Sequence, residues 1–336
     1  MAFDVKVNID LAKPIGKVGF GVPLILQEYA DSAIAFTEVS NISEVAAAGF
    51  DETSKVFKAA RLMFSQKNAP KKIAVCAVTD SAEKAMADVS ITGKSWRQLI
   101  VVNENAESAT SVTSISAAVE TLEGKMFYAG LETDDATTMT VSGIRRTVLF
   151  YCDATEDVPV PVAALVGETA GLAAGSFTYK NMPLTGIAAQ DLTDAEIEAI
   201  HKKGGITFVQ KAGDNVTSEG KVAGGEYIDI IDSEDYIVQQ MAYRTQKVLN
   251  NNVKVPYDNN GIGLLESVAK SVLQEAYNNG MIATNEDGSP AYTVDYALRE
   301  DTKETDRANR EYLGGNFSFK LAGAIHQVEI TGEITV

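Results

Sequence analysis

Short apolar runs alternate with helical patterns between residues 22 and 190, and this alternation limits the possible folds more than any other feature of the chain. The runs are rich in β-branched residues, and the segments between them carry apolar residues at helical spacing. Strands are expected at residues 23–26, 33–39, 73–78, 99–102, 126–131 and 147–151, and helices at 43–48, 54–64, 81–89, 108–122 and 160–174. This order predicts an α/β domain with a mainly parallel or mixed sheet and helices on its faces.

The rest of the chain predicts a second domain of the α+β type. Thr193 and Glu196 have the spacing of a capping box and predict the start of a helix. Strands are expected at residues 206–210, 225–231, 317–321 and 325–336, and helices from the cap Ser233 and over 262–278. We divide the chain into an N-terminal arm (1–20), an α/β middle domain (21–190), an α+β C-terminal domain (191–326) and a C-terminal arm (327–336).

Both ends of the chain alternate apolar and polar residues, which predicts an extended β-strand arm at each terminus. The apolar members are Val5, Val7, Ile9 and Leu11 in one arm and Val328, Ile330, Ile334 and Val336 in the other. Unpaired backbone groups along a strand invite pairing with another edge, either in the same chain or on a neighbour. Two such ends favour a subunit that links to copies of itself by strand addition.

A hinge is expected after the N-terminal strand, at Pro14, Gly16, Gly19 and Gly21. Proline and closely spaced glycines break regular structure and allow the arm to leave the body at an adjustable angle. The glycine order only superficially resembles a dinucleotide-binding loop, because these glycines precede a strand and do not join a strand to a helix. We therefore expect no cofactor-binding residues.

Composition argues against several classes of partner. The 336 residues contain 29 basic and 46 acidic side chains, a net charge of −17. A nucleic-acid-binding surface needs a basic footprint, and anionic lipid also attracts basic segments, so neither partner is expected. The first ten residues carry charges where a signal peptide has an apolar run. Cys76 and Cys152 lie in apolar runs and are expected to be buried, reduced thiols.

The chain contains little that predicts catalysis. His201 and His326 are its only histidines, and His201 is expected to be a solvated residue at a helix end. No phosphate-binding loop, nucleophile elbow or zinc motif is present in the sequence. We therefore expect no catalytic residues, no cofactor and no metal site. An α/β enzyme that uses nucleotides remains an alternative function, and a monomeric binding module, whose terminal strands pair with each other, is another.

Acidic residues are densest at Glu226, Asp229, Asp232, Glu234 and Asp235. They suggest either a site for a hard cation or, more simply, a strand with exposed acids followed by the acidic first turn of a helix. The mixed charges between residues 299 and 311 indicate a solvated face, and they would also suit an interface with complementary charge.

The C-terminal third resembles the contractile tail sheath proteins of phages and R-type bacteriocins, and specifically their minimal, short type. The resemblance rests on three stretches, at residues 225–249, 254–280 and 306–332, of which the last is the most specific. A weaker match covers residues 4–26, and residues 27–190 match only as a generic α/β insertion.

The resemblance implies a structural subunit and no enzymatic activity. Sheath subunits stack as helical rings around an inner tube, exchange terminal strands with their neighbours, and contract to drive the tube through a target envelope. The implied partners are further copies of the chain, the tube protein, and baseplate and terminator proteins. The implied location is the bacterial cytoplasm during assembly, and then a released phage or bacteriocin particle. The helix over 235–249 is implied to face the tube, with Arg244 and Lys247 as its tube-facing charges.

Overall fold

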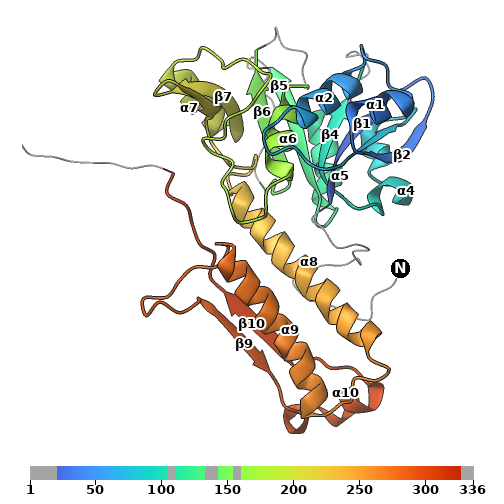
Figure 1. Ribbon diagram of the computed structural model, residues 1–336, viewed down its shortest axis with the longest axis vertical. Coiled ribbons are helices and arrows are strands. Elements are labelled where there is room, and N and C mark those ends of the chain that lie inside the picture. Colours follow the sequence, from blue (N-terminus) through green and yellow to red (C-terminus); the bar gives the residue numbers. More distant parts are fainter. Residues whose placement is uncertain (1–20, 105–109, 133–142, 154–159, 327–336) are drawn as a thin grey trace, which may run out of the picture.

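The computed structural model describes residues 21–104, 110–132, 143–153 and 160–326, which form two parts (Figure 1). An α/β sandwich is built by residues up to about 227. A smaller unit of helices and a β-hairpin follows it and is joined to the sandwich by one long helix. The predicted arms, with Val5, Val7, Ile9, Leu11, Val328, Ile330, Ile334 and Val336, lie outside the described residues, as do the hinge positions Pro14, Gly16 and Gly19.

The sandwich is centred on an eight-stranded sheet in the order β2-β3-β1-β4-β5-β6-β7-β8. The strands are β1 (Val22–Gln27), β2 (Ile34–Val39), β3 (Ile73–Ala77), β4 (Trp96–Val102), β5 (Met126–Glu132), β6 (Thr147–Cys152), β7 (Gly205–Lys211) and β8 (Asp214–Thr217). Neighbouring strands are parallel except at the two edges, where β2 and β8 pair antiparallel. The prediction of a mainly parallel or mixed sheet is therefore confirmed.

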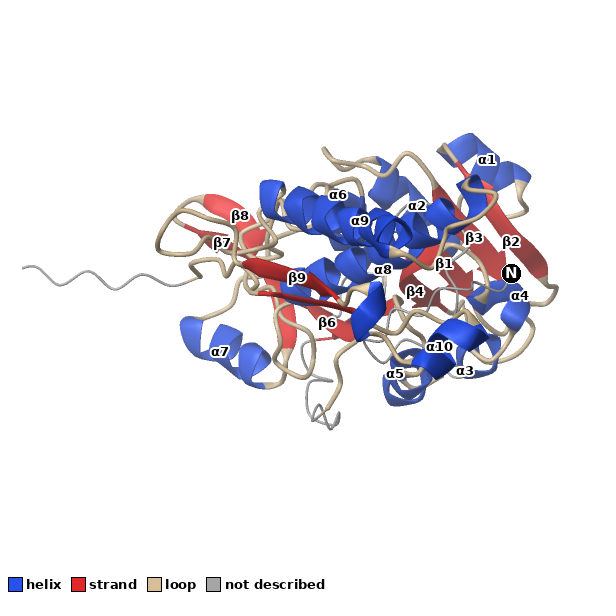
Figure 2. Ribbon diagram, turned by 90° about the horizontal axis from the view of Figure 1, so that it is seen from below, coloured by secondary structure: helices blue, strands red, loops and turns tan. Residues whose placement is uncertain are grey.

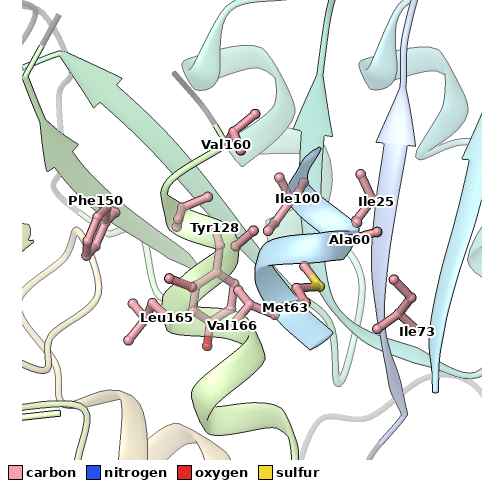
Figure 3. Packing of buried hydrophobic residues seen from close by; sticks show 14 of the residues in the cluster. Ile25, Ala60, Met63, Ile73, Ile100, Tyr128, Phe150, Val160, Leu165 and Val166 are labelled. Atoms are coloured by element: carbon pink, nitrogen blue, oxygen red, sulfur yellow. The ribbon is translucent and has the colours of Figure 1, made fainter. Parts of the chain in front are cut away.

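Helices cover both faces of this sheet (Figure 2). The first face carries α1 (Ile42–Ala47), α2 (Lys55–Phe64) and α6 (Val162–Ala170), and the second carries α3 (Ala82–Ala85), α4 (Val89–Thr92), α5 (Val112–Glu120) and α7 (Asp194–Lys202). Alternate strand residues serve the two faces: Ile25 and Ile100 pack toward α2 and α6 (Figure 3), whereas Leu24 and Leu99 pack on the other side. Burial on both faces explains why the strands are continuous apolar runs.

Two features of the sandwich differ from the sequence-based expectation. The sheet continues through β7 and β8, so the expected domain boundary at residue 190 falls inside the region that builds it. The helix expected over 81–89 is split in two, because the Asp88 carboxylate accepts a hydrogen bond from the Ser90 amide and caps a new helix. By contrast, the Thr193–Glu196 capping box is present as predicted at the start of α7.

The second part consists of two long helices and a hairpin. The helices are α8 (Ile228–Asn251) and α9 (Asn259–Asn278), the hairpin strands are β9 (Tyr292–Tyr296) and β10 (Gly315–Phe319), and the 3-10 turn Arg299–Asp301 and α10 (Glu304–Asn309) lie between the strands. Ile237 and Met241 of α8 pack against Ala269 and Leu273 of α9. The 24 residues of α8 span roughly 36 Å, so this helix runs from the edge of the sandwich along the whole second part (Figure 1).

The start of α8 corrects a prediction. Residues 225–231 were expected to be a strand and Ser233 a helix cap, but the helix already begins at Ile228, after the N-cap residue Tyr227. Ile228 and Ile231, one turn apart, are both buried in the core of the sandwich. Ser233 lies inside the helix, where its hydroxyl donates to the Asp229 carbonyl at 2.7 Å. At the other end, Ile325 and His326 are described but lie outside any strand, although a strand was expected from residue 325.

Candidate functional site: the domain junction and the open hairpin

The first two turns of α8 are held by arginines that lie at the amino ends of two sheet strands. Arg97, near the start of β4, is almost fully buried, and its guanidinium donates to Asp232 at 2.5 Å and also to Asp235. Arg146, immediately before β6, donates to both oxygens of Asp235, at 2.8 and 3.0 Å. The carboxylates lie on one face of the helix because they are three residues apart. Both charged arginines therefore pin α8 to the sheet.

Buried tyrosines complete this junction. The Tyr179 hydroxyl donates to the second Asp232 oxygen at 2.6 Å, and Tyr128 donates to Tyr179 at 3.3 Å. Burial alone would raise the pKa of Asp235, but Arg97 and Arg146 outweigh it and lower this pKa to about 2. The carboxylate is thus ionised throughout the physiological pH range, and the junction is a fully formed ion-pair network.

A more exposed pair of contacts lies at the rim of the same junction. Arg145 donates to both oxygens of Glu226, at 2.5 and 2.8 Å, and to Glu234 at 2.8 Å. Four members of the acidic cluster, Glu226, Asp232, Glu234 and Asp235, thus pair with arginines at the start of sheet strands, whereas Asp229 does not. Within the described ranges, no group of three or more His, Cys, Asp or Glu side chains is arranged to hold a metal ion.

The point where the described chain ends is also fixed to the start of α8. The His326 ring nitrogen Nδ1 lies 2.9 Å from a Glu219 oxygen, and the ring packs edge-on against Tyr227 with centroids 4.7 Å apart. The His326 carbonyl accepts a hydrogen bond from Lys180 at 2.9 Å. We call His326, Glu219, Tyr227 and Lys180 the C-terminal latch. No local pattern predicts the C-terminal latch, because Lys180 and His326 lie far along the chain from Glu219 and Tyr227.

The other histidine does not have the solvated role expected for it. His201 Nε2 lies 2.9 Å from the Ser218 hydroxyl, and the ring is partly buried, which lowers the pKa of His201. The two histidines therefore contact adjacent residues: His201 contacts Ser218, and His326 contacts Glu219.

Gly21 is the first described residue and is closely packed where the chain enters the sheet. Its φ is +92°, and a Cβ added there would lie 2.6 Å from the Trp96 carbonyl carbon and 2.8 Å from the Arg97 nitrogen. Of the predicted hinge positions, this one is the fixed end, since the backbone around it leaves no room for a side chain.

Replacing Gly21 with alanine is expected to lower the free energy of unfolding by about 2–4 kcal/mol, because a positive φ and a collision with backbone combine. Gly213→Ala is the matched control, since its φ is +94° but nothing lies within 4 Å of the added Cβ. The control should cost about 1–2 kcal/mol. Urea unfolding of both variants measures the difference, and equal losses would contradict the tight packing at Gly21.

The predicted tube-facing residues lie in different surroundings on α8. Arg244 is half-buried and donates to Glu275 of α9 at 2.5 Å and to Gln240 at 3.1 Å. Lys247 is exposed, and within the described chain no carboxylate lies within 4.0 Å of its ammonium group. Arg244 thus has a structural role between α8 and α9, whereas Lys247 presents its charge to solvent.

The hairpin formed by β9 and β10 is open. Its inward face carries the partly buried Tyr292, Val294, Tyr296, Phe317 and Phe319, which pack toward α9. A sheet of two strands is marginal by itself and needs further strands or packing against a helix, which α9 provides on one face. Exposed Leu298 and Leu313 lie in the connection beside it. Among the described residues no third strand pairs along β9 or β10, and the aromatic side chains of the hairpin are only partly covered.

In the eight-stranded sheet, the side chain of Glu28 fills the position at which sheets of this kind usually bind a ligand. In doubly wound sheets ligands bind at the carboxyl ends of the strands where the strand order reverses, which here lies between β1 and β4. Buried Glu28 occupies this place and accepts hydrogen bonds from the Ala82 amide at 2.8 Å, the Thr110 amide at 2.7 Å and the Asn103 side chain at 3.3 Å. A fixed carboxylate repels phosphate, which argues against a nucleotide site.

The remaining sequence features have simple structural roles. Cys76 and Cys152 are both buried, as predicted, and burial raises the pKa of Cys76 to about 12. The mixed charges over residues 299–311 are mostly exposed. No helix in the described segments has the length and apolar character needed to cross a membrane.

We compared the chain with protein families, curated proteins and solved structures. Residues 228–334 match a family model described as "E217 tail sheath protein gp31-like, C-terminal domain". A comparison with curated proteins found no match. The matched segment begins at the first residue of α8 and includes α9 and the hairpin.

Solved structures resemble the chain over its whole length. The baseplate of the anti-feeding prophage contains a chain with a TM-score of 0.71 and 16% identity, with 100% of this chain and 99% of that chain covered. The contracted sheath complex of the extracellular contractile injection system PVC gives 0.66 and 14%, with 100% and 96% covered. The sheath tail protein of Listeria innocua gives 0.54 and 12%, with 92% and 96% covered. Residues 228–334 thus match the C-terminal domain family of tail sheath proteins, and the chain has the fold of a contractile sheath protein.

Proposed function

We propose that the chain is the structural subunit of a contractile sheath, which polymerises as a helix around an inner tube and contracts to drive the tube through a target envelope. The family match over residues 228–334 is the observation that carries this proposal. The full-length fold likeness to a contracted anti-feeding prophage sheath, with a TM-score of 0.68, supports it. The subunit would belong to a phage tail, an R-type bacteriocin or a related injection particle, after assembly in the bacterial cytoplasm.

The open hairpin supports a specific mode of polymerisation. The apolar residues of the arms, Val5, Val7, Ile9 and Leu11 and Val328, Ile330, Ile334 and Val336, would extend the partly buried aromatic face of a neighbour's hairpin. The arm backbones would pair with the free edges of β9 and β10, as in other cases of strand addition. Pro14, Gly16 and Gly19 would let the first arm change its angle while Gly21 stays fixed in the body.

Polymerisation of the purified protein tests the proposal. Electron microscopy should show long hollow cylinders, alone or around tube protein. A monomer that persists across a range of salt and protein concentrations would contradict it and would favour a monomeric binding module.

The charges on α8 provide a further expectation about the tube. Lys247→Glu should lower the amount of sheath protein that cosediments with purified tube protein about tenfold, because a reversed charge faces a charge-complementary surface. Lys202→Glu, the same change on α7 of the sandwich, serves as the control and should leave cosedimentation unchanged. Arg244→Glu should instead destabilise the subunit, since it breaks the contact with Glu275. Equal cosedimentation of the Lys247→Glu and Lys202→Glu variants would show that this face of α8 does not contact the tube.

A further inference from the structure

The described chain leaves the body at two points, and their surroundings have one element in common. At the C-terminal point, His326 contacts Glu219 and Tyr227, and Tyr227 is the residue that caps α8. Asp229, in the first turn of α8, also interacts electrostatically with His326, which partly offsets the rise in the pKa of Asp229 caused by burial. The C-terminal latch thus acts directly on the first turn of α8.

At the N-terminal point, contact with α8 is made through a single arginine. Gly21 is packed against the backbone of Trp96 and Arg97, and Val22 pairs with Trp96 in the sheet. The Arg97 side chain continues from there to Asp232 and Asp235. Gly21 and Asp232 also line the same small cavity, of about 30 Å³. The N-terminal point is therefore separated from the second turn of α8 by one buried side chain.

The helix between these two points is suited to transmit a load. It is rigid, it is tied to the sheet by Arg97 and Arg146, and its far half forms the core of the second part with α9. A force on either end of the chain would act on the same short segment of α8. Because the helix is rigid, it would transmit that force to the whole second part. A subunit whose ends were attached to different elements would deform between them instead of turning as one body.

We infer that residues 227–235 of α8 form a common anchor for both terminal arms, and that the C-terminal latch and Arg97 are the positioning contacts that connect the arms to it. This inference rests on the proposed function, in which the arms link neighbouring subunits. It goes beyond that function by assigning the element of the subunit at which the links from opposite sides meet. When both arms are bound to neighbouring subunits, the two points where the chain leaves the body are held in place. The first turns of α8 then open to solvent less often.

Hydrogen exchange of the α8 amides over residues 230–238 tests this inference in the full-length protein, as monomer and as polymer. In the unchanged protein, polymerisation should slow exchange there about tenfold, as charge-assisted hydrogen bonds at the latch become less free to open. His326→Ala should still polymerise but should lose this additional protection. His201→Ala is the matched control, because His201 contacts the neighbouring Ser218 without touching the chain exit, and it should keep the protection.

A second, more conservative variant tests the same contact in case His326→Ala disturbs folding. Glu219→Gln keeps the shape of the side chain while removing its charge, and it should show an intermediate loss of protection. Equal protection in all the polymers would overturn the common anchor while leaving the proposed function intact. If the unchanged protein forms no polymer at all, the proposed function fails, and the inference fails with it.

Discussion

Deleting residues 1–12 or residues 327–336 is expected to abolish polymerisation and leave a soluble, folded monomer. The described core residues of the sandwich and of the α8–α9 unit all lie between 22 and 326, so neither deletion removes one of them. A strand adds backbone hydrogen bonds worth roughly 0.5–1.5 kcal/mol each, so one arm is individually weak. Repetition of the link in every subunit makes it decisive for the polymer.

A point substitution in the arm gives a finer test of the same claim. Ile330→Pro removes one backbone donor and disrupts a ladder without changing charge, whereas Ile330→Val retains both donor and pattern and serves as the control. Sedimentation and circular dichroism should show loss of polymer but a cooperative melt for the proline variant. Aggregation or failure to fold would instead show that the terminal strands belong to the subunit's own core.

Arg97→Met is expected to lower the free energy of unfolding by about 3–5 kcal/mol. The change leaves Asp232 and Asp235 in a buried site without their main cation, and removing one member of a buried ion pair has a cost of this size. Arg145→Met is the matched control, because Arg145 is about half exposed and pairs with Glu226 and Glu234 at the rim. Surface pairs of this kind contribute about 0–1 kcal/mol. Equal losses in urea unfolding would show that the buried network does not hold α8.

The pH dependence of stability provides a second readout for the same variant. The folded pKa of Asp235, about 2, lies below its ordinary value of 3.8. Its contribution, about 2 kcal/mol, is therefore present above pH 4 and is lost as the pH falls toward 2. In the Arg97→Met variant Asp235 retains only Arg146, so this loss should be smaller and should occur at higher pH.

The sequence predicted the strands of the sandwich well because each is buried on both faces. The six expected strands between residues 23 and 151 all occur, and composition alone marks such runs. The resemblance to sheath proteins was equally informative and is confirmed by the family match and the fold. The pairing of β7 and β8 with the same sheet depends on contacts between distant segments, which no local pattern records.

The ion-pair junction at the start of α8 was not predicted, for a related reason. Residues 225–231 combine β-branched and aromatic residues with acids, so the local composition favours a strand, although burial of Ile228 and Ile231 one turn apart decides for a helix. Arg97 offered a usable signal. A charged residue next to an apolar strand requires a buried partner if the strand extends through it. The strand expected from residue 99 in fact begins at Trp96, and the partner carboxylates belong to the acidic cluster.

A reconstruction of the polymer by electron cryomicroscopy would show whether subunits are linked through their terminal strands. We expect β9 and β10 to be extended into a larger sheet by strands traced to residues 5–11 and 328–336 of neighbouring subunits. Terminal strands that fold back onto their own subunit, with contacts between neighbours made only by the bodies, would contradict it.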